Sequence, residues 1–480
     1  MSSDAGAVLL GRTDRALGLV DRFYGCFTDG RRAGLIEHAV TTLVRQRVYG
    51  IALGYEDLND HDALRHDPVL AAVNGKLRAG RDDCAALAGK STLNRLELTR
   101  AGAVTRYHKI GHDPAAIERL FVDLFVAAHA TAPAEIVLDL DATDDPVHGQ
   151  QEGRFFHGFY DGYCYLPLYV FCGDHLLVAK LRRANIDGSA GAVEEMARVM
   201  GQIRQSWPAT RIVLRADSGF ARDALMAWCE ANAVDYVFGL ARNDRLVATI
   251  EAELAAAAQD AAASGQPARR FKELRHRTLD SWSRERRVVA KAEVTHGKEN
   301  PRFVVTSPAL ARHDARALYE DIYCARGKME NKIKECQLDL FADRTSAATM
   351  MANQLRLWFV SMARVLVASL RRRALQATTL ARATCANDPA QAPKKRRLGA
   401  HQRASGPAAG DGLGPSPSAA TRQSPTPLLA VRVDTTQTAH RPHRRSLTLR
   451  KARQRRSLPE NRPTPSSDLL VDGGRQKIAR

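Results

Sequence analysis

Acidic residues lie at the ends of two apolar segments that are predicted to be β-strands. Asp139 and Asp141 alternate with Leu138 and Leu140 in LDLDATDD, and because side chains alternate along a strand, both acids are expected on one face. Asp217 follows a second apolar segment, in RADSGF. An acid at the end of a buried strand is costly unless something neutralises it, and a divalent cation is a natural partner. The alternative for each acid is a turn-former or a helix cap.

A third acid lies farther along the chain, in YCARGKMENKIKE. On a helix, Tyr323, Arg326, Glu330 and Lys334 would share one face, because they are spaced by three, four and four residues. An arginine fork suits bidentate contact with phosphate, and a lysine adds a point charge. Three carboxylates that hold two Mg²⁺ ions would clamp the attacking and leaving oxygens of a phosphodiester. The alternative is a solvated, charged helix face.

The elements that must position these acids are predicted from apolar alternation and segment length. Strands are expected at 135–141, 164–171, 176–181, 211–215 and 236–240, with helices at 192–205 and 222–231. The order β-β-β-α-β-α-β predicts an α/β fold, an RNase H-like mixed sheet with flanking helices.

Changes in composition and periodicity divide the chain into five expected parts. These are a helical DNA-binding region (1–130), the first part of a catalytic core (131–241), an inserted, mainly β subdomain (242–312), core helices that carry the third acid (313–375) and a basic, Pro-rich disordered tail (376–480).

A polar and basic helix is expected within the N-terminal region, in LAGKSTLNRLELTR. Ser91 and Thr92 are good helix-cap residues, and the helix that they would start exposes Asn94 and Arg95. A short helix, a glycine turn and such a helix outline a helix-turn-helix DNA reader. An ordinary solvated helix is the alternative.

Most of the net charge of +18 lies in the tail. Residues 376–480 hold twenty Lys or Arg against six Asp or Glu, which is +14 of the total, and they include eleven of the twenty prolines and no Phe, Tyr or Trp. Such a segment cannot bury enough apolar surface to fold, so it is predicted to be disordered. Its abrupt onset suggests a frameshifted or read-through terminus, a hypothesis that resequencing of the coding region tests. The remaining chain is only mildly basic, so bulk charge is weak evidence for DNA binding.

Export and membrane insertion are not expected. The most apolar stretch, 348–370, contains Asn353, Gln354, Arg356 and Arg364, which predicts an amphipathic or buried helix. The N-terminus lacks a signal-peptide core. The eight cysteines form no C-x-x-C pair and no zinc-finger spacing, which is typical of reduced thiols in a cytoplasmic protein.

Three separated motifs, LDLDATDDPVHG, LRADSGF and Y-x-x-R-x-x-x-E within YCARGKMEN, together resemble the DDE transposases of bacterial insertion sequences. The insertion-sequence-1380 group, a relative of the insertion-sequence-4 group, is most similar. The resemblance runs from about residue 10 to about residue 375 and includes GYEDLNDHDALRHD and STLNRLE. It implies a catalytic, metal-binding triad of Asp141, Asp217 and Glu330, with phosphate contacts from Tyr323 and Arg326.

The resemblance also implies cofactors and partners. The triad would hold two Mg²⁺ ions, with Mn²⁺ as a substitute, and the partners would be the terminal inverted repeats of the element and target DNA. A homodimer on DNA and a nucleoid-associated, cytoplasmic location are expected. The family motif places the metal ligand two residues before a threonine, which selects Asp141 through Thr143. The wider pattern has a lysine seven positions after the glutamate, where this chain has Gln337, so Lys334 is the best substitute.

Two other functions compete with transposition. Asp139-Leu140-Asp141-Ala142-Thr143 also matches the D-x-D-x-T start of a phosphatase-type hydrolase, in which Asp139 would be the nucleophile and Asp141 an acid/base. That interpretation leaves the segment from Tyr323 to Glu330 without a role. The second competitor is a catalytically inactive DNA-binding remnant, in which the acids persist without chemistry.

Overall fold

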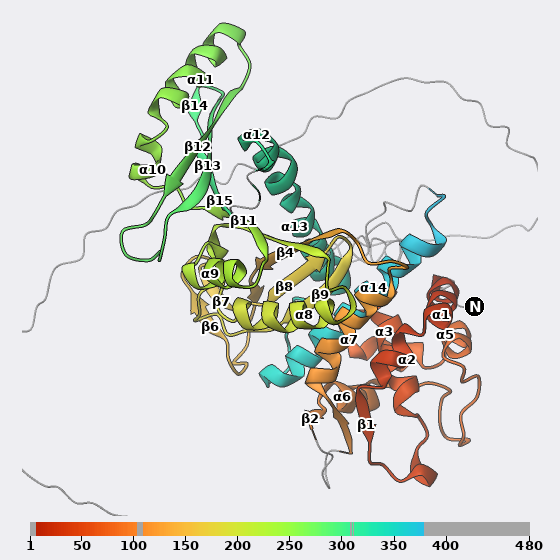
Figure 1. Cartoon of the computed structure of the whole chain (residues 1–480). Helices are drawn as coiled ribbons and strands as arrows, with labels where there is room; N and C mark the ends of the chain where they lie inside the picture. Colours follow the sequence, from red (N-terminus) through yellow and green to blue (C-terminus); the bar gives the residue numbers. More distant parts are fainter. Residues whose placement is uncertain (1–5, 103–108, 308–309, 311, 379–480) are drawn as a thin grey trace, which may run out of the picture. The chain divides into compact units, whose positions relative to one another are not determined.

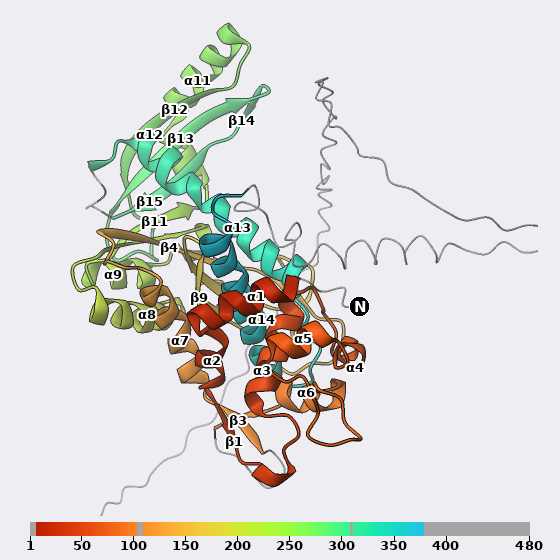
Figure 2. The ribbon, with the colours of Figure 1, turned by 90° about the vertical axis from the view of Figure 1, so that its right-hand side faces the viewer.

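Residues 6–102, 109–307, 310 and 312–378 are described by a computed structural model (Figures 1 and 2), and all of them belong to one structural unit. The tail predicted at 376–480 lies outside the described residues from position 379 onward. No helix within these ranges combines the length and the apolar character needed to cross a membrane.

A mixed sheet forms the centre of the structure, as the sequence predicts. Its five central strands are β4 (Glu135–Ala142), β8 (Leu168–Cys172), β9 (His175–Lys180), β10 (Arg211–Ala216) and β11 (Asp235–Leu240). They lie in the spatial order β11-β10-β4-β8-β9. Strands β10 and β11 are parallel, β10 is also parallel to β4, and β8 is antiparallel to both β4 and β9. The carboxyl ends of β4 and β10 therefore meet at one edge of the sheet.

One expected strand, 164–171, is wrong as a single element. The structure divides it between β7 (Gly162–Tyr165) and β8, and the break falls at Pro167. Proline cannot donate to a ladder, which is why a strand interior does not tolerate it. Strand β7 instead joins β5 (Asp145–Pro146) and β6 (Phe155–His157) in a small sheet of order β5-β7-β6.

Helices cover both faces of the central sheet. On one face, Leu138 and Leu140 of β4 pack with residues of α8 (Ala192–Ser206) and α9 (Asp223–Ala231) in one buried cluster. On the other face, Tyr169 of β8 packs with α14 (Met350–Ala374). The alternation of β4 therefore sends its leucines into one core and its acids to the opposite face.

The strands of segment 242–312 extend the central sheet. The segment contains α10 (Asp244–Ala248), α11 (Glu251–Ser264), β12 (Ala268–His276), β13 (Arg286–Thr295), β14 (Lys298–Glu299) and β15 (Arg302–Thr306). Strand β15 pairs antiparallel with β11, and β13 pairs with both β15 and β12. In Figures 1 and 2, α11 lies along β12 and β13.

The N-terminal part is largely helical. Its helices are α1 (Gly6–Leu17), α2 (Leu19–Tyr24), α3 (Val40–Ala52), α4 (His61–Leu64), α5 (Pro68–Val73), α6 (Lys90–Glu97) and α7 (Pro114–Ala127), with 3₁₀ turns η1 (Ala33–Leu35) and η2 (Leu58–Asp60). A small sheet that the periodicity does not predict pairs β1 (Phe27–Asp29), β3 (Ile110–His112) and β2 (Arg100–Ala101).

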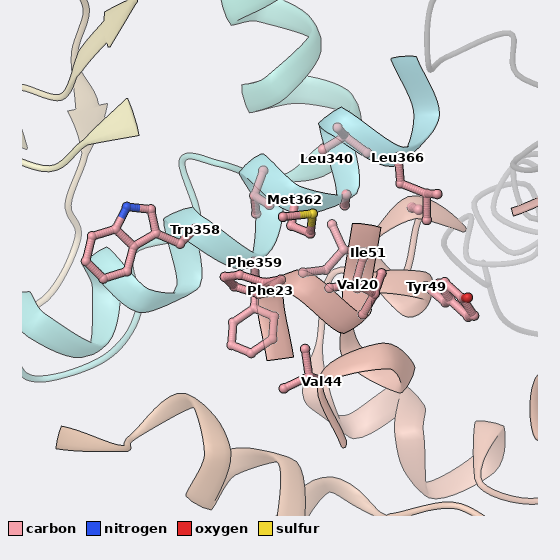
Figure 3. Packing of buried hydrophobic residues seen from close by; sticks show 14 of the residues in the cluster. Val20, Phe23, Val44, Tyr49, Ile51, Leu340, Trp358, Phe359, Met362 and Leu366 are labelled. Atoms are coloured by element: carbon pink, nitrogen blue, oxygen red, sulfur yellow. The ribbon is translucent and has the colours of Figure 1, made fainter. Parts of the chain in front are cut away.

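Helix α14 ties this N-terminal part to the sheet. Figure 3 shows Phe359 of α14 beside Phe23 of α2, and their ring centroids lie 5.4 Å apart in an edge-to-face contact. Val44 and Ile51 of α3 and Met362 of α14 belong to the same buried cluster. The stretch 348–370 is thus mainly a buried helix, as predicted.

The core helices expected over 313–375 are present, but the first of them is irregular. This part consists of α12 (Ala315–Ala317), the π-helical η5 (Leu318–Tyr323), the 3₁₀ turn η6 (Cys324–Arg326), α13 (Gly327–Lys334) and the π-helical η7 (Glu335–Asp339), and α14 follows after the non-helical residues 341–349. The π and 3₁₀ turns rotate successive side chains by other angles than an α-helix does, and such turns are frequent at functional sites.

Candidate active site

Asp141 and Asp217 end neighbouring parallel strands. Asp141 is the next-to-last residue of β4, and its side chain is 14% exposed. Asp217 follows β10 directly and caps a 3₁₀ turn, where its Oδ1 accepts a hydrogen bond of 2.9 Å from the Gly219 amide. Because β4 and β10 are parallel and adjacent, both acids lie at the same sheet edge.

Asp141 is electrostatically coupled to three charged side chains. The pKa of Asp141 is raised to about 6, mainly by burial. The Arg326 guanidinium lowers this pKa, whereas the charges of Asp217 and Glu330 act in the same direction as burial. Arg326 Nη1 donates to Asp141 Oδ2 at 3.4 Å, and the Ala142 amide donates to Oδ1 at 3.0 Å. Asp217 and Glu330 are therefore each within electrostatic reach of Asp141.

Glu330 is the most exposed of the three acids. It lies on α13, its side chain is 56% exposed, and its carboxylate forms an ion pair of 2.7 Å with Lys334 one turn later. The hydrogen bond from Lys334 is the main reason why the pKa of Glu330 is lowered. Within the described residues, no three or more His, Cys, Asp or Glu side chains form a group arranged to hold a metal ion. The metal-binding triad thus stays a prediction.

Tyr323 packs beside Asp217 above a glycine of β11. A Cβ atom built on Gly239 would lie 2.5 Å from Tyr323 Oη and 3.2 Å from the carbonyl carbon of Asp217. Only glycine leaves room for this approach. Burial raises the pKa of Tyr323, and the charge of Asp217 acts in the same direction. A glycine inside an apolar strand, here Gly239 in YVFGL, is the sequence signal for such an approach.

Asp139 is fully neutralised by an arginine that the sequence analysis did not single out. Arg215 Nε and Nη2 donate to the two carboxylate oxygens of Asp139 at 2.5 and 3.0 Å, and both residues are buried. Asp139 and Arg215 are paired in the register of β4 and β10. Arg215 Nη1 also donates to the Ile322 carbonyl at 2.6 Å. A charged residue in an otherwise apolar strand was the available signal.

Gln337 holds the loop that follows Asp141. Its Nε2 donates to the Asp144 carbonyl at 2.9 Å and to Asp145 Oδ1 at 3.0 Å. Asp145 is completely buried, and burial raises its pKa to about 8. The residue at the position of the family lysine therefore supports the loop next to Asp141, while Lys334 pairs with Glu330.

Asn94 and Arg95 are exposed on α6, which packs against α3 and α14. Figures 1 and 2 show α6 well away from α13, so the structure does not bring these two residues to the acids. The expected cap at Ser91 or Thr92 is wrong by two or three positions, because α6 starts at Lys90 and its N-cap is Gly89. Asp62 Oδ1 accepts from the Lys90 amide at 3.0 Å and supplies the acceptor that a local Ser or Thr cap would have provided.

Two acids at one sheet edge, a third within electrostatic reach and an arginine at hydrogen-bond distance are the residue types of enzymes that transfer phosphoryl groups. The family model described as transposase DDE domain, group 1, matches residues 1–387, so the chain belongs to this transposase family. No curated protein matches the chain.

The chain is also distantly similar to a solved structure. The piggyBac transposase in a synaptic complex with hairpin DNA, determined by cryo-electron microscopy, is 8% identical, with 84% of this chain and 82% of that chain covered and a TM-score of 0.39. The family assignment rests on the family match and not on this distant likeness.

Proposed function

We propose that this transposase has an RNase H-like core that cuts the ends of an insertion sequence and joins them to target DNA. Asp141, Asp217 and Glu330 would be the catalytic acids. The observation that carries the proposal is the coupling of a buried carboxylate, Asp141, to two further acids and to Arg326.

The donor chemistry of these residues fits a hard divalent cation. All three acids offer oxygen ligands, and two of them end adjacent parallel strands. Burial keeps the pKa of Asp141 raised to about 6 despite the nearby Arg326, and the charges of Asp217 and Glu330 contribute in the same direction. Mg²⁺ ions at these carboxylates, with Mn²⁺ as a substitute, would neutralise charge on the attacking and leaving oxygens of a phosphodiester.

The reaction consists of two displacements at phosphorus. Water attacks the phosphodiester at each element end, the bond from phosphorus to O3′ breaks, and a free 3′-hydroxyl remains. That hydroxyl then attacks a target phosphodiester, whose own bond to O3′ breaks. The Arg326 guanidinium would orient the phosphate through charge-assisted hydrogen bonds, with Tyr323 and Lys334 on the flanking backbone.

The remaining DNA contacts are assigned to the N-terminal part. Asn94 and Arg95 are exposed on α6 and would bind the terminal inverted repeats at a distance from the cut. Because two ends must be held together, the working form would be a homodimer on DNA. The protein would act in the cytoplasm, on the nucleoid.

The test is a nicking assay on the terminal repeats of the element with Mg²⁺ and then with EDTA. Asp217→Asn is expected to lower cleavage at the repeat boundary by at least about a hundredfold while DNA binding stays within about twofold. Asparagine keeps the acceptor for the Gly219 amide, so the turn is retained. Asp260→Asn, at an exposed ion pair on α11, is the matched control and should cleave normally. Normal cleavage by Asp217→Asn would refute the proposal. Metal-independent binding without cleavage by the unaltered protein would instead favour a DNA-binding remnant.

A further inference from the structure

The hairpin of β6 and β7 exposes an unusual number of aromatic side chains. Four aromatic residues in the described parts of the chain are classed as exposed, and three of them, Phe156, Phe159 and Tyr163, lie within eight positions, with exposed fractions of 54, 85 and 50%. The fourth is Tyr24 on α2. Large apolar groups gathered on a surface mark an interaction site more often than single exposed ones do. Residues 154–163 are named the aromatic hairpin below.

The register of the aromatic hairpin separates its rings by face. Phe155 pairs with Cys164, and both pack into a small buried cluster. The next pair, Phe156 and Tyr163, therefore lies on the outer face, with ring centroids 5.7 Å apart and nearly perpendicular planes. The Arg154 guanidinium lies 4.4 Å from the centre of the Tyr163 ring. The outer face thus combines two rings with a stacked cation.

The aromatic hairpin is joined to the catalytic acids by strand pairing. Strand β5 begins three residues after the end of β4, the strand that carries Asp141, and β5 pairs with β7 of the hairpin. The hairpin is therefore attached next to the end of β4. Tyr160 packs in the same cluster as Ala142, the neighbour of Asp141. Burial and the charges of Asp144, Asp141 and Asp217 raise the pKa of Tyr160 to about 12. The Phe159 ring lies 5.0 Å from the Tyr160 ring, so the exposed rings continue outward from the acids.

We infer that the aromatic hairpin stacks unpaired nucleobases of the DNA strand whose phosphodiester lies at Asp141 and Asp217. This inference rests on the proposed function. Aromatic rings bind bases of any sequence through their π-faces, and an arginine adds cation–π contact and attraction to the backbone. Tyr160 packs with Ala142, the neighbour of Asp141, and the Phe159 ring lies 5.0 Å from the Tyr160 ring, so the bases next to the scissile bond are the ones within reach.

Unpaired bases fit this surface better than a second protein chain does. The three exposed rings cover one short hairpin, and a stable protein interface needs roughly 800 Å² on each partner. Tyr160 also lies between the exposed Phe159 ring and the sheet edge that carries Asp141 and Asp217, where a DNA strand would already be bound. Binding of a second copy of the chain to these rings is therefore one of the outcomes that the test distinguishes.

The test measures binding of the full-length protein, in EDTA, to a DNA duplex with a short single-stranded overhang and to a blunt duplex of the same sequence. The overhang carries 2-aminopurine, whose fluorescence is quenched by stacking. Phe159→Ala is expected to weaken binding of the overhang DNA roughly tenfold and to remove the quenching, while blunt-duplex binding stays within about twofold. Phe159→Trp, which keeps a ring, should restore both readouts. Tyr24→Ala is the matched control for an exposed aromatic residue.

Three outcomes would overturn the inference. The first is that Phe159→Ala binds the overhang DNA as well as the wild type does. The second is that it binds the overhang DNA and the blunt duplex equally more weakly. The third is that, without DNA, Phe159→Ala sediments differently from the wild type while its DNA affinity is unchanged, which would assign the rings to contact between two copies. The Mg²⁺ nicking assay separates the two proposals. Stacking without cleavage would refute the proposed chemistry and not the hairpin, whereas cleavage with unaltered overhang binding by Phe159→Ala would refute only the hairpin.

Discussion

Two carboxylates on the same face of β4 have opposite surroundings. Both oxygens of Asp139 accept hydrogen bonds from Arg215, whereas Asp141 receives one longer contact from Arg326 and lies near two other acids. Breaking a buried ion pair is strongly destabilising, so Asp139 has a structural role in its pair with Arg215. This counts against the phosphatase-type alternative, because that mechanism needs Asp139 as a free nucleophile. Asp141 is left as the acid with unsatisfied charge.

Asp145 provides a pH-dependent prediction at the same scale. Its folded pKa is about 8, and the usual carboxyl value is 3.8. The folded state therefore binds the proton more tightly than the unfolded state does, and the free energy of unfolding should fall as the pH rises from about 4 to about 8. Asp145→Asn removes this dependence but keeps an acceptor for Gln337 Nε2.

Chemical denaturation at pH 5 and pH 8.5 checks this prediction. The wild type should lose on the order of a few kcal/mol relative to Asp145→Asn between these two pH values. The difference between the two proteins cancels the titration of the other groups. Parallel stability curves would show that Asp145 is ionised in the folded protein at neutral pH.

At the scale of elements, the interrupted helix decides where Tyr323 and Arg326 lie. A continuous α-helix would align Tyr323, Arg326, Glu330 and Lys334 on one face. Instead, Tyr323 ends a π-helical segment and Arg326 lies in a 3₁₀ turn before α13 begins. Tyr323 then packs beside Asp217 while Arg326 contacts Asp141. The pairing of Glu330 with Lys334, which lies within α13, keeps the expected helical spacing.

Gly239 of β11 is the element-scale test of this arrangement. In Gly239→Ala, the new methyl group would meet Tyr323 Oη at 2.5 Å and the Ser218 amide nitrogen at 2.9 Å. We expect a loss of stability of about 1–3 kcal/mol and a larger loss of cleavage, because Asp217 and Tyr323 must move apart. Thermal unfolding and the nicking assay measure the two effects.

Gly201→Ala is the matched control for this substitution. Gly201 lies in α8 with no atom within 4 Å of its added Cβ, so alanine should leave the stability unchanged or raise it by about 0.5–1 kcal/mol. Wild-type cleavage by Gly239→Ala would mean that the close packing of Tyr323 on Asp217 is not needed for the chemistry.

At the scale of the whole described chain, α14 packs against both the N-terminal helices and the central sheet. Its buried residues pack with α2 and α3 of the N-terminal part, and they also pack with Tyr169 and Phe171 of β8. Gln354 of α14 adds hydrogen bonds to the backbone of Leu181, just after β9, and of Ala179 within it. The N-terminal helices and the sheet therefore share one core, and we expect them to unfold together.

Phe359→Ala tests this shared core. The side chain is fully buried, and its ring contacts the rings of Phe23 and Phe27. Truncation should lower the free energy of unfolding by about 3–5 kcal/mol. Urea denaturation, followed by far-UV circular dichroism and by tryptophan fluorescence, should give coincident transitions that both shift. Leu338→Ala, at a residue 71% exposed, is the control. Separate transitions would show that the two parts fold independently.

The sequence by itself determined most of the central strands, the helices between them and the positions of Asp141 and Asp217 at strand ends. These features depend on local periodicity, which neighbouring residues encode. The parallel pairing of β4 with β10, which brings the two acids to one sheet edge, is a feature of the tertiary structure. The positions of Arg215, Gly239 and Gln337 near the acids were decided only by the tertiary structure. Each of them contacts a residue at least twenty positions away in the chain, through strand register or side-chain packing. The helix interruptions around Tyr323 lie where Leu318 and Tyr319 pack against strands of the sheet, and local helix preference does not predict them.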